Sequence, residues 1–466
     1  MKYQRLLEGL EASEILLSQV LTASYSGRID STFFLKEYLN HKSFEFPYKL
    51  NQIANIKSGT TPADRDDDLK EGVMLLKTNN IRNNILNKYS DINYFIHEEV
   101  NKKMKSSELK EYDVLVNIVG ATLDVVGRVG YVTNSLPKSN ITQAMSFLRL
   151  KNEYKTDFIP AYLFIFLQSK FGKIQLNRHA RPTGQYNLNN EELGAVRVIK
   201  LDISVQEKIE ELVNISLSTL IESNQFYQSA QNLLLEHLGL KDFNPPTQTV
   251  NIKSFADSFG TLGRLDAEFY QKKYESYLKK IQAYPNGCEP IRKACKLKDV
   301  NYMPKDNQTY QYIELSNIGN SGEITGASLD LGCNLPSRAR RKVSKNDVIV
   351  SSIEGSLASC AIVSEQYHQA LCSTGFYVVS SEKINSETLL MLFKSEPIQQ
   401  LLKQGCSGTI LTAINKDEFL NIPLPLVDVN VQTQISDLIQ QSDRLRQESQ
   451  ALLEEAKRKV EQAIES

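Results

Sequence analysis

Residue types that could carry out chemistry are present in this chain, but their spacing does not assemble a reaction centre. Asn244-Pro245-Pro246-Thr247 is close to the Asn-Pro-Pro-aromatic tetrapeptide of amino-methyltransferases, yet Thr247 stands where an aromatic ring would stack the target base. No glycine-rich cofactor loop at the end of a strand precedes it. The segment from Gly120 to Gly127 lacks the Gly-Lys-Ser/Thr ending of a phosphate loop, and it predicts a hairpin instead.

Metal and thiol chemistry are not indicated either. The five histidines are scattered without metal-ligand spacing, and each is expected at the surface. All six cysteines lie between Cys288 and Cys406, and the nearest pair, Cys288 and Cys295, lacks the short spacing of zinc ligands or redox dithiols. Reduced, mostly buried thiols are therefore expected. The acidic run from Asp64 to Asp68 lacks the alternation and terminal glutamate of a calcium loop. We expect a non-catalytic protein with no cofactor and no metal.

An internal repeat is the strongest feature of the sequence. Gly27-Arg28-Ile29-Asp30 returns as Gly263-Arg264-Leu265-Asp266. Asp113-Val114-Leu115-Val116 returns, in the same order along the chain, as Asp347-Val348-Ile349-Val350. Two related modules therefore share the 466 residues, a length that suits two globular units better than one core.

Each module ends in a long predicted helix, from Val205 to Leu238 and from Val431 to about Ile464, which at about 1.5 Å per residue makes a rod on the order of 50 Å. Steps of three and four residues place a regular stripe on both helices. The stripes are Ile209, Leu212, Ser216, Thr219, Ser223, Phe226 and Ala230 in the first helix, and Ile435, Leu438, Ser442, Leu445, Ser449, Leu452 and Ala456 in the second. Small residues at matching levels favour antiparallel pairing of the helices over separate packing of each on its own module.

The predicted fold class is α+β: two similar mixed α/β domains separated by long antiparallel coiled-coil helices, with a pseudo-twofold internal repeat. The expected segments are an N-terminal helix packed on the helical bundle (1–26), a first domain (27–204), a central helix (205–240), a linker (241–262), a second domain (263–430) and a C-terminal helix (431–466). Leu6, Leu10, Ser13, Leu17 and Val20 form the stripe of the N-terminal helix. Gly239 and the prolines at 245 and 246 end the central helix.

Shorter patterns indicate how each domain is built. Apolar runs predict strands at Val114–Val119, Val125–Val132, Val348–Ile353 and Phe376–Val379. Helical runs at Ile159–Phe171 and Thr388–Leu402 fall at equivalent places in the two copies. Each domain should therefore mix sheet and helix.

Net charge and hydropathy limit where the protein is expected in the cell and how it could bind nucleic acid. The chain has 54 Lys and Arg against 55 Asp and Glu, a formal net charge of −1, which would be unusual for a protein that coats nucleic acid indiscriminately. Any DNA contact must therefore be local. No segment predicts a secretory leader or a membrane span, so a cytoplasmic location away from membranes is expected.

Local signals for nucleic-acid contact occur in both copies. The stretch from Lys170 to Asn187 concentrates cations, amides and glycine, and Arg can grip guanine as Asn or Gln can grip adenine. Any exposed loop can collect such residues, so this stretch alone leaves DNA contact and an ordinary solvated loop equally open. The second copy carries a basic run from Arg338 to Lys342, and the smaller, more apolar Cys406–Ile410 stands in place of Pro182–Asn187. Two domains of similar fold with different loops are suited to recognising two different DNA sequences.

At these residues the chain resembles the specificity subunit of type I restriction-modification systems. Lys57 to Pro62, followed by Met74 to Ile81, is similar to that family's opening strand, Ser/Thr-rich loop and next strand. Arg181 to Leu188 leads to Val205-Gln206 as the family's sequence leads to its conserved helices. The resemblance spans nearly the whole chain.

The second copy carries the same resemblance with some departures. Gly408 to Leu411 leads to Ile422–Leu426 and then to Val431-Gln432. The second copy has no Ser-Gly-Thr-Thr-Pro near Lys298–Val300, which puts its first DNA-facing loop in doubt, and the first copy lacks the Ile-Pro-Leu-Pro run at Val196–Leu201.

The resemblance implies a non-catalytic DNA-reading subunit. Each of two target-recognition domains would read one half of a bipartite double-stranded DNA target, while the helices set the spacing and bind two methyltransferase subunits. A restriction/translocase subunit can join such a complex. The competing class is a non-catalytic protein-interaction scaffold with paired modules on a coiled coil. Salt-sensitive binding to DNA separates the two classes.

The resemblance and the loop composition together nominate site residues. The expected DNA-binding residues are Lys57, Ser58, Thr60, Thr61, Thr78, Asn79, Asn80, Arg82, Arg178, Arg181, Thr183, Gln185, Tyr186, Asn317, Arg338, Arg340, Arg341, Ser407 and Thr409. The expected partner-binding residues on the helices are Leu212, Phe226, Leu438 and Leu452.

Overall fold

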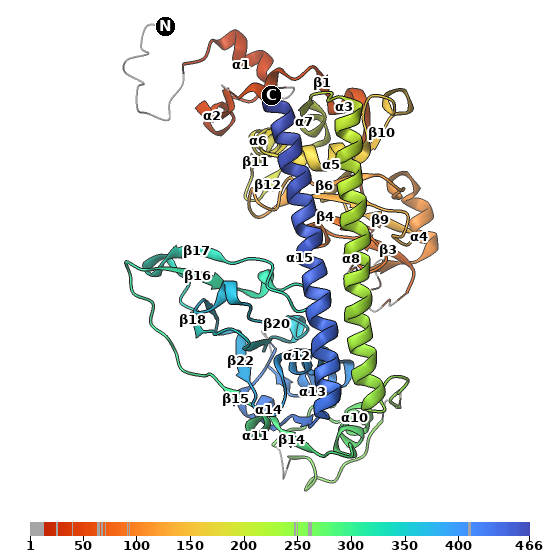
Figure 1. Cartoon of the computed structure of the whole chain (residues 1–466), viewed down its shortest axis with the longest axis vertical. Coiled ribbons are helices and arrows are strands. Elements are labelled where there is room, and N and C mark those ends of the chain that lie inside the picture. Colours follow the sequence, from red (N-terminus) through yellow and green to blue (C-terminus); the bar gives the residue numbers. More distant parts are fainter. Residues whose placement is uncertain are drawn as a thin grey trace. The chain divides into compact units, whose positions relative to one another are not determined.

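The computed structural model describes residues 14–24, 27–39, 41–62, 66, 69, 71–90, 92, 94–246, 248, 250–259, 263–408 and 412–466. The chain packs as two units, one made of Met1–Ile221 with Arg446–Ser466 and the other of Glu222–Leu445. Both units mix helix and sheet, and two long helices, α8 (Ile203–His237) and α15 (Val429–Glu465), contribute residues to each (Figure 1). The predicted α+β class is confirmed.

The first unit holds short strands and helices ahead of α8. Its helices are α1 (Leu17–Ala23), α2 (Lys36–Leu39), α3 (Leu50–Ile53), α4 (Glu98–Lys103), α5 (Pro160–Gln168), α6 (Lys170–His179) and α7 (Asn190–Ala195). Its strands are β1 (Tyr48–Lys49), β2 (Ala54–Ser58), β3 (Val73–Leu76), β4 (Asn84–Leu86), β5 (Phe95–Ile96), β6 (Val114–Asn117), β7 (Val119–Gly120), β8 (Val129–Val132), β9 (Ser139–Ile141), β10 (Met145–Leu150), β11 (Arg181–Pro182), β12 (Tyr186–Asn187) and β13 (Arg197–Val198).

The first unit has two main sheets among its described residues. The larger has the strand order β2-β10-β6-β8-β4, and the smaller has the order β5-β3-β9, with β3 and β9 parallel. The four residues of β6 are all buried, as expected for a β-branched central strand. Helix α5 is buried from Ala161 to Leu167 and belongs to the main core of the unit. An apolar helix without a polar face suits such a buried position.

The second unit repeats this plan. Its helices are α10 (Lys272–Gln282), α11 (Ile291–Ala294), α12 (Ser386–Lys394), α13 (Glu396–Gln404) and α14 (Lys416–Asn421). Its strands are β14 (Cys288–Pro290), β15 (Lys296–Leu297), β16 (Thr309–Ile313), β17 (Ser328–Leu331), β18 (Ala339–Lys342), β19 (Val348–Ser351), β20 (Cys360–Ile362), β21 (Leu371–Ser373), β22 (Phe376–Ser380), β23 (Cys406–Ser407), β24 (Ala413–Ile414) and β25 (Pro423–Pro425).

Sheets of the second unit correspond to sheets of the first. The order β15-β22-β19-β20 matches β2-β10-β6-β8, and β17-β16-β21 matches β5-β3-β9, again with the last two strands parallel. The small pairs β14-β25 and β23-β24 match β1-β13 and β11-β12. The internal repeat seen in the sequence is therefore a repeat of folded modules.

The predicted stripes on the long helices are where the helices meet. In the first unit the hydroxyls of Ser216 on α8 and Ser449 on α15 lie 2.8 Å apart, and both serines are buried. In the second unit those of Ser223 and Ser442 lie 3.2 Å apart, also buried. From Ser216 to Ser223 the residue numbers on α8 rise, while those of the partners on α15 fall from Ser449 to Ser442. The two helices therefore pair antiparallel, as the stripes predicted. The helices begin two residues earlier than expected, at Ile203 and Val429.

One buried glutamine fixes the start of each long helix. The amide of Gln206 donates to the carbonyls of Asp157 and Leu201 at 2.8 and 2.9 Å, and its oxygen accepts from the Ile159 N–H at 2.9 Å. Gln432 does the same in the second unit, donating to Lys383 and Val427 at 3.0 and 2.8 Å and accepting from Asn385 at 2.8 Å.

Several local expectations were wrong. Ile159–Phe171 and Thr388–Leu402 are not single helices, because Ser169 and Ser395 adopt extended backbone and separate α5 from α6 and α12 from α13. Serine readily caps the helix that follows it, and the Ser169 hydroxyl accepts from the Gly172 N–H. The predicted strand Val125–Val132 starts only at Val129, since the preceding residues turn the hairpin between β6 and β8.

Some expectations stay predictions. Leu6, Leu10 and Ser13 lie outside the described residues, and Leu17 is 71% exposed on α1, so packing of an N-terminal helix on the bundle rests on the sequence pattern alone. The domain limits proposed from sequence also remain predictions, because the boundary between the two packed units falls within the long helices.

Candidate nucleic-acid interface

A hollow of about 290 Å³ opens in the first unit at the edge of its smaller sheet. The turn after β3 supplies Lys77 and Thr78, and the turn after β9 supplies Thr142, Gln143 and Ala144. The remaining lining residues are Thr61, Asp66, Leu69, Leu75, Tyr94, Phe95 and Ile96. Polar side chains beside an aromatic floor suit recognition of a flat, hydrogen-bonding ligand such as a base edge.

A hollow of about 410 Å³ occupies the equivalent place in the second unit. The turn after β16 supplies Glu314, Leu315 and Ser316, and residues 373–375 come from the last residue of β21 and the turn after it. The remaining lining residues are Arg338, Ser352, Ile353 and Ala413.

The strand register shows that the two hollows are the same site in two copies. Leu76 pairs with Ile141 in the first unit, and Ile313 pairs with Cys372 in the second. The residues that follow these pairs are therefore equivalent, so that Lys77 corresponds to Glu314 and Thr142 to Ser373. Continuing by one residue, the exposed Gln143 corresponds to the exposed Thr374. The frames agree and the linings differ.

The turn after the central strand is built alike in both units. The Asn80 side-chain oxygen accepts from the Lys77 N–H at 2.8 Å, and that of Asn317 accepts from the Glu314 N–H at 2.9 Å. Both predicted DNA ligands thus hold their own turns in place. The Asn79 side chain is exposed, and so is Arg82, whose Nε donates to the Asn79 carbonyl at 3.3 Å.

The Ser-Gly-Thr-Thr-Pro loop brings the end of β2 to the first hollow. Gly59 approaches the backbone so closely that a Cβ there would lie 1.9 Å from the Ile141 carbonyl oxygen, which excludes every other residue type. The loop places Thr61 in the hollow, whereas Lys57 and Thr60 are exposed. Ser58 is held inside, since its hydroxyl accepts from the Asn190 amide at 2.7 Å.

The hairpin β11–β12 presents the predicted reading loop of the first copy. Its tip, Pro182 to Gln185, is exposed, and Gly184 takes φ +81°, a conformation that favours glycine. Thr183 closes the tip by donating its N–H to the Gln185 carbonyl at 2.8 Å. Tyr186 is half-buried and pairs with Gly120 of β7.

The arginines beside this hairpin have protein partners. The Arg181 guanidinium donates to the buried carboxylate of Glu192 at 2.8 Å. Arg178 is 9% exposed, lies over the rings of Phe33 and Phe44, and donates to the Phe33 carbonyl at 3.0 Å. Burial lowers the pKa of Arg178 to about 10. The structure thus assigns Arg178 to the interior of the unit and does not bring it to the exposed hairpin.

The basic run of the second copy divides between surface and interior. Arg338 lines the hollow with its side chain 63% exposed and lies 3.8 Å from the Glu314 carboxylate. Arg340 donates to the Ser337 carbonyl at 2.9 Å near the surface. Arg341 turns inward and donates to the Asp299 carbonyl at 2.7 Å, which leaves its side chain 16% exposed. Ser407 is exposed, and Thr409 lies outside the described residues.

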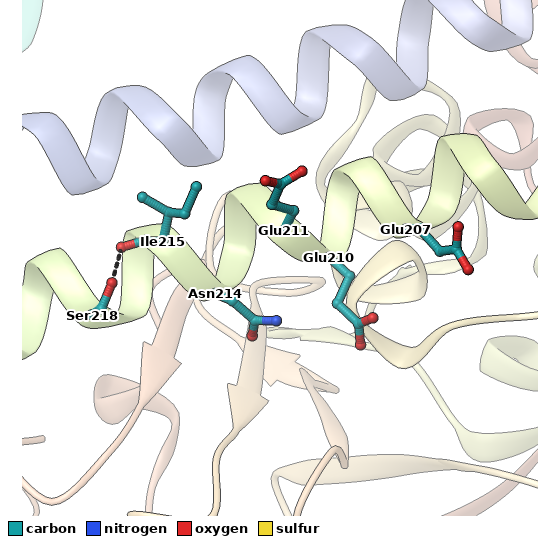
Figure 2. A pocket seen from close by; sticks show the side chains of 6 residues that line it. All are labelled: Glu207, Glu210, Glu211, Asn214, Ile215 and Ser218. Atoms are coloured by element: carbon teal, nitrogen blue, oxygen red, sulfur yellow. Dashed lines mark hydrogen bonds between the residues drawn. The ribbon is translucent and has the colours of Figure 1, made fainter.

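A third hollow, of about 400 Å³, lies on α8 and differs in character. Figure 2 shows that its lining comes from one helix: Glu207, Glu210, Glu211, Asn214, Ile215 and Ser218. Burial and the neighbouring Glu207 raise the pKa of Glu210. Three carboxylates repel a phosphate backbone, so this face of α8 is not suited to DNA.

The four residues proposed to bind partner subunits are half-buried. Leu212 packs against the core of the first unit, and Leu438 packs against that of the second. Part of each side chain is therefore used within the chain itself.

Other predicted features behave as follows. His179 was expected at the surface, and this was wrong: it is 5% exposed, its Nδ1 lies 2.7 Å from a Glu192 carboxylate oxygen, and burial lowers its pKa. Cys360, Cys372 and Cys406 are buried, whereas Cys333 is exposed. Asp66 is described, but the rest of the acidic run 64–68 is not.

No group of three or more His, Cys, Asp or Glu among the residues that the structure describes is arranged to hold a metal ion. None of the described helices combines the length and apolar character needed to cross a membrane.

The comparisons with known proteins agree with these features. Residues 290–458 match the family model described as the type I restriction modification DNA specificity domain. The type I restriction enzyme EcoBI specificity subunit of Escherichia coli is 29% identical over 203 residues, which cover 41% of this chain and 40% of that protein. The chain thus spans about two fifths of the length of that curated relative.

Solved structures resemble the chain at low scores. One is a type I restriction-modification system S subunit from M. genitalium, with a TM-score of 0.35 and 12% identity over 88% of this chain and 94% of that one. Another is the HsdS subunit from Thermoanaerobacter tengcongensis, with a TM-score of 0.25 and 13% identity over 90% and 94%. Scores this low carry no argument about the arrangement of the units. The family-model match covers residues 290–458, so the sequence similarity to that family lies in the second half of the chain.

Proposed function

We propose that this chain is the DNA sequence-specificity subunit of a type I restriction-modification complex, acting in the cytoplasm without catalytic groups of its own. Each unit reads one half of a bipartite double-stranded target. The surface of the first unit combines Thr61, Thr78, Gln143 and the β11–β12 hairpin. That of the second combines Arg338, Ser316, Thr374 and Ser407.

The matched hollows carry this proposal. Both copies use equivalent strand pairs and the same asparagine-held turn, yet where one copy has Lys77 and Gln143 the other has Glu314 and Thr374 at the equivalent positions. A duplicated binding frame with different polar linings is what reading two different half-sites requires, because donors and acceptors at base edges distinguish the base pairs. A duplicated scaffold for one partner protein would have no need of different linings.

In this proposal the protein partners bind the long helices. Two methyltransferase subunits bind them and supply the chemistry, and a restriction/translocase subunit can join. The acidic face of α8 at Glu207, Glu210 and Glu211 supports protein contact here, because it disfavours phosphate. Near-neutral net charge also fits a subunit that binds DNA firmly only as part of a complex.

The test is selection of binding sites from a random duplex DNA pool by the chain assembled with its methyltransferase subunits. We expect two enriched sequence blocks separated by a gap of fixed length. The affinity for the enriched duplex should fall steeply as salt rises, because phosphate contacts release counterions.

The protein-interaction scaffold predicts a different result. A scaffold would enrich no sequence, and the assembled complex would bind no better with this chain than without it. The methyltransferase subunits alone serve as the control, since they show how much binding is independent of this chain.

A further inference from the structure

The repeated Gly-Arg-x-Asp motif forms a clamp in the first unit. Arg28 is 5% exposed, and its guanidinium donates from Nε and Nη2 to both carboxylate oxygens of Asp30 at 2.8 and 2.7 Å. The Nη1 group of Arg28 points to the end of α6, where it lies 3.1, 2.9 and 3.4 Å from the carbonyl oxygens of Arg178, His179 and Ala180. Gly27 starts the motif at φ +59°.

The second copy forms the same clamp on the equivalent helix. Arg264 donates to both oxygens of Asp266 at 2.8 and 2.9 Å. Its Nη1 and Nη2 reach the carbonyl oxygens of Gln404, the last residue of α13, and of Cys406, the first residue of β23, at 3.5 and 3.2 Å. Gly263 starts this copy at φ +67°.

Both arginines sit on an aromatic ring that comes five residues later in the motif. The Arg28 guanidinium carbon lies 4.7 Å from the centre of the Phe33 ring, and that of Arg264 lies 4.2 Å from the Phe269 ring. The ring, the carboxylate and the carbonyls contact each guanidinium on several sides. A lysine ammonium, which is a compact charge on a flexible chain, could not make all of these contacts at once.

The location of the clamp connects it to recognition. The last carbonyls of a helix lack partners within the helix and carry its negative end, so a cation there fixes where the helix stops. In the first unit the next residues are the hairpin Arg181–Asn187, and in the second they are the strand that begins at Cys406. The clamp therefore lies directly before the β11–β12 hairpin in the first unit and at the start of β23 in the second.

We infer that Arg28 and Arg264 are positioning residues that hold the reading segments, the β11–β12 hairpin in the first unit and Cys406–Ser407 in the second, and so contribute to the specificity of one half-site each. Neither touches DNA, because the Arg28 side chain is 4% exposed and that of Arg264 17% exposed. The inference rests on the proposed function. It goes beyond that function by naming the residues that hold the reading segments in position.

The experiment compares Arg28→Lys and Arg264→Lys in the assembled complex, again by selection from random duplex DNA. Lysine keeps the charge but cannot span the carboxylate and the helix end together. We expect Arg28→Lys to lower base discrimination in the first half-site by roughly tenfold, about the effect of one mismatched base pair, and to leave the second unchanged. Arg264→Lys should do the reverse.

Arg149→Lys is the matched control. Arg149 also makes a two-fold contact with a carboxylate, that of Asp113 at 2.7 and 2.7 Å, but it lies on β10. It should lower thermal stability much as Arg28→Lys does, without changing either half-site. If Arg28→Lys does not fold, Asp30→Asn, which loosens the same clamp, carries the same expectation.

Three results would decide against the inference. Equal weakening of both half-sites by Arg28→Lys would show a general loss of folded protein. Unchanged discrimination in a folded Arg28→Lys or Asp30→Asn complex would show that the loop is aimed by other contacts. Failure of the unaltered complex to enrich any sequence would overturn the proposed function itself, and this inference with it.

Discussion

At the scale of single residues, comparison of the two copies distinguishes residues that hold the turns in place from exposed residues at the opening of each hollow. Asn80 and Asn317 hold the same turn with the same hydrogen bond, at 2.8 and 2.9 Å. The exposed positions beside those turns differ, with Gln143 in one copy and Thr374 in the other. Side chains that hold the frame are therefore kept between copies, whereas side chains at the opening vary.

Exchange of the two rim residues tests this division. Gln143→Thr should remove a long amide that can bond a base edge at two points, at a cost of about 1–3 kcal/mol in discrimination at one base pair. Thr374→Gln should create a new preference in the other half-site. Site selection from random duplex DNA measures both, with Asn152→Ala as the control because Asn152 is exposed outside the hollow. A change in the same half-site for both substitutions would contradict the assignment.

Some residues that line the two hollows were predicted from the sequence and others were not. Thr61, Thr78 and Arg338 were predicted and line the hollows. Gln143 and Thr374 were missed, because each sits in a short polar turn that resembles any other until the parallel pairing of β3 with β9, or of β16 with β21, brings it beside the first turn. Arg178 was misplaced because its burial depends on Phe33 and Phe44, which are distant in sequence.

At the scale of elements, periodicity identified the long helices and missed the short breaks. The stripes on α8 and α15 depend on spacing alone, and Ser216, Ser223, Ser442 and Ser449 are buried as the registers required. The breaks at Ser169 and Ser395 could not be read in the same way, because a serine inside an apolar run is compatible with a continuous helix. Only the packing of two short helices decides between the alternatives.

The buried glutamines at the starts of α8 and α15 predict a measurable stability effect. Gln206→Ala leaves the Ile159 N–H and two carbonyls without their side-chain partner in a buried place, and each such group costs about 1–3 kcal/mol. The midpoint of thermal unfolding should fall by several degrees, and Gln432→Ala should behave alike. Gln434→Ala is the control, since Gln434 is exposed on α15. Equal midpoints for Gln206→Ala and Gln434→Ala would refute the role.

At the scale of the whole molecule, the repeat was the part of the fold that the sequence predicted best. The order and type of the matched blocks predicted two similar modules, and β15-β22-β19-β20 and β17-β16-β21 of the second unit correspond to β2-β10-β6-β8 and β5-β3-β9 of the first. The domain limits proposed from the sequence remain predictions, and the boundary between the packed units falls within both long helices. Such a boundary depends on contacts between segments far apart in the chain, which local patterns do not contain.

The proposed role of the helices in setting the spacing predicts a shift in the gap. Removing residues 217–223 and 443–449 deletes one repeat of the stripe from each helix and leaves Ser216 opposite Ser442. Seven residues of helix correspond to about 10 Å, or about three base pairs at roughly 3.4 Å each. Methylome sequencing of a host carrying this variant and its methyltransferase subunits should show a gap shorter by about that amount.

Removal of seven residues from one helix only is the control for that deletion, because it misaligns the serine levels and should impair folding. An unchanged gap in the double deletion would show that the helices do not measure the target.

The composition of the first unit has a consequence for how the protein is made. Ile209 and Val213 share a core with Ala456 and Val460, so that core stays open until residues 446–466 have left the ribosome. Domains usually complete in the order of their synthesis, the N-terminal one first. Here the order is reversed: the module translated first is the last to close, and a premature stop codon between the second module and Arg446 would remove the part of α15 that completes the first module.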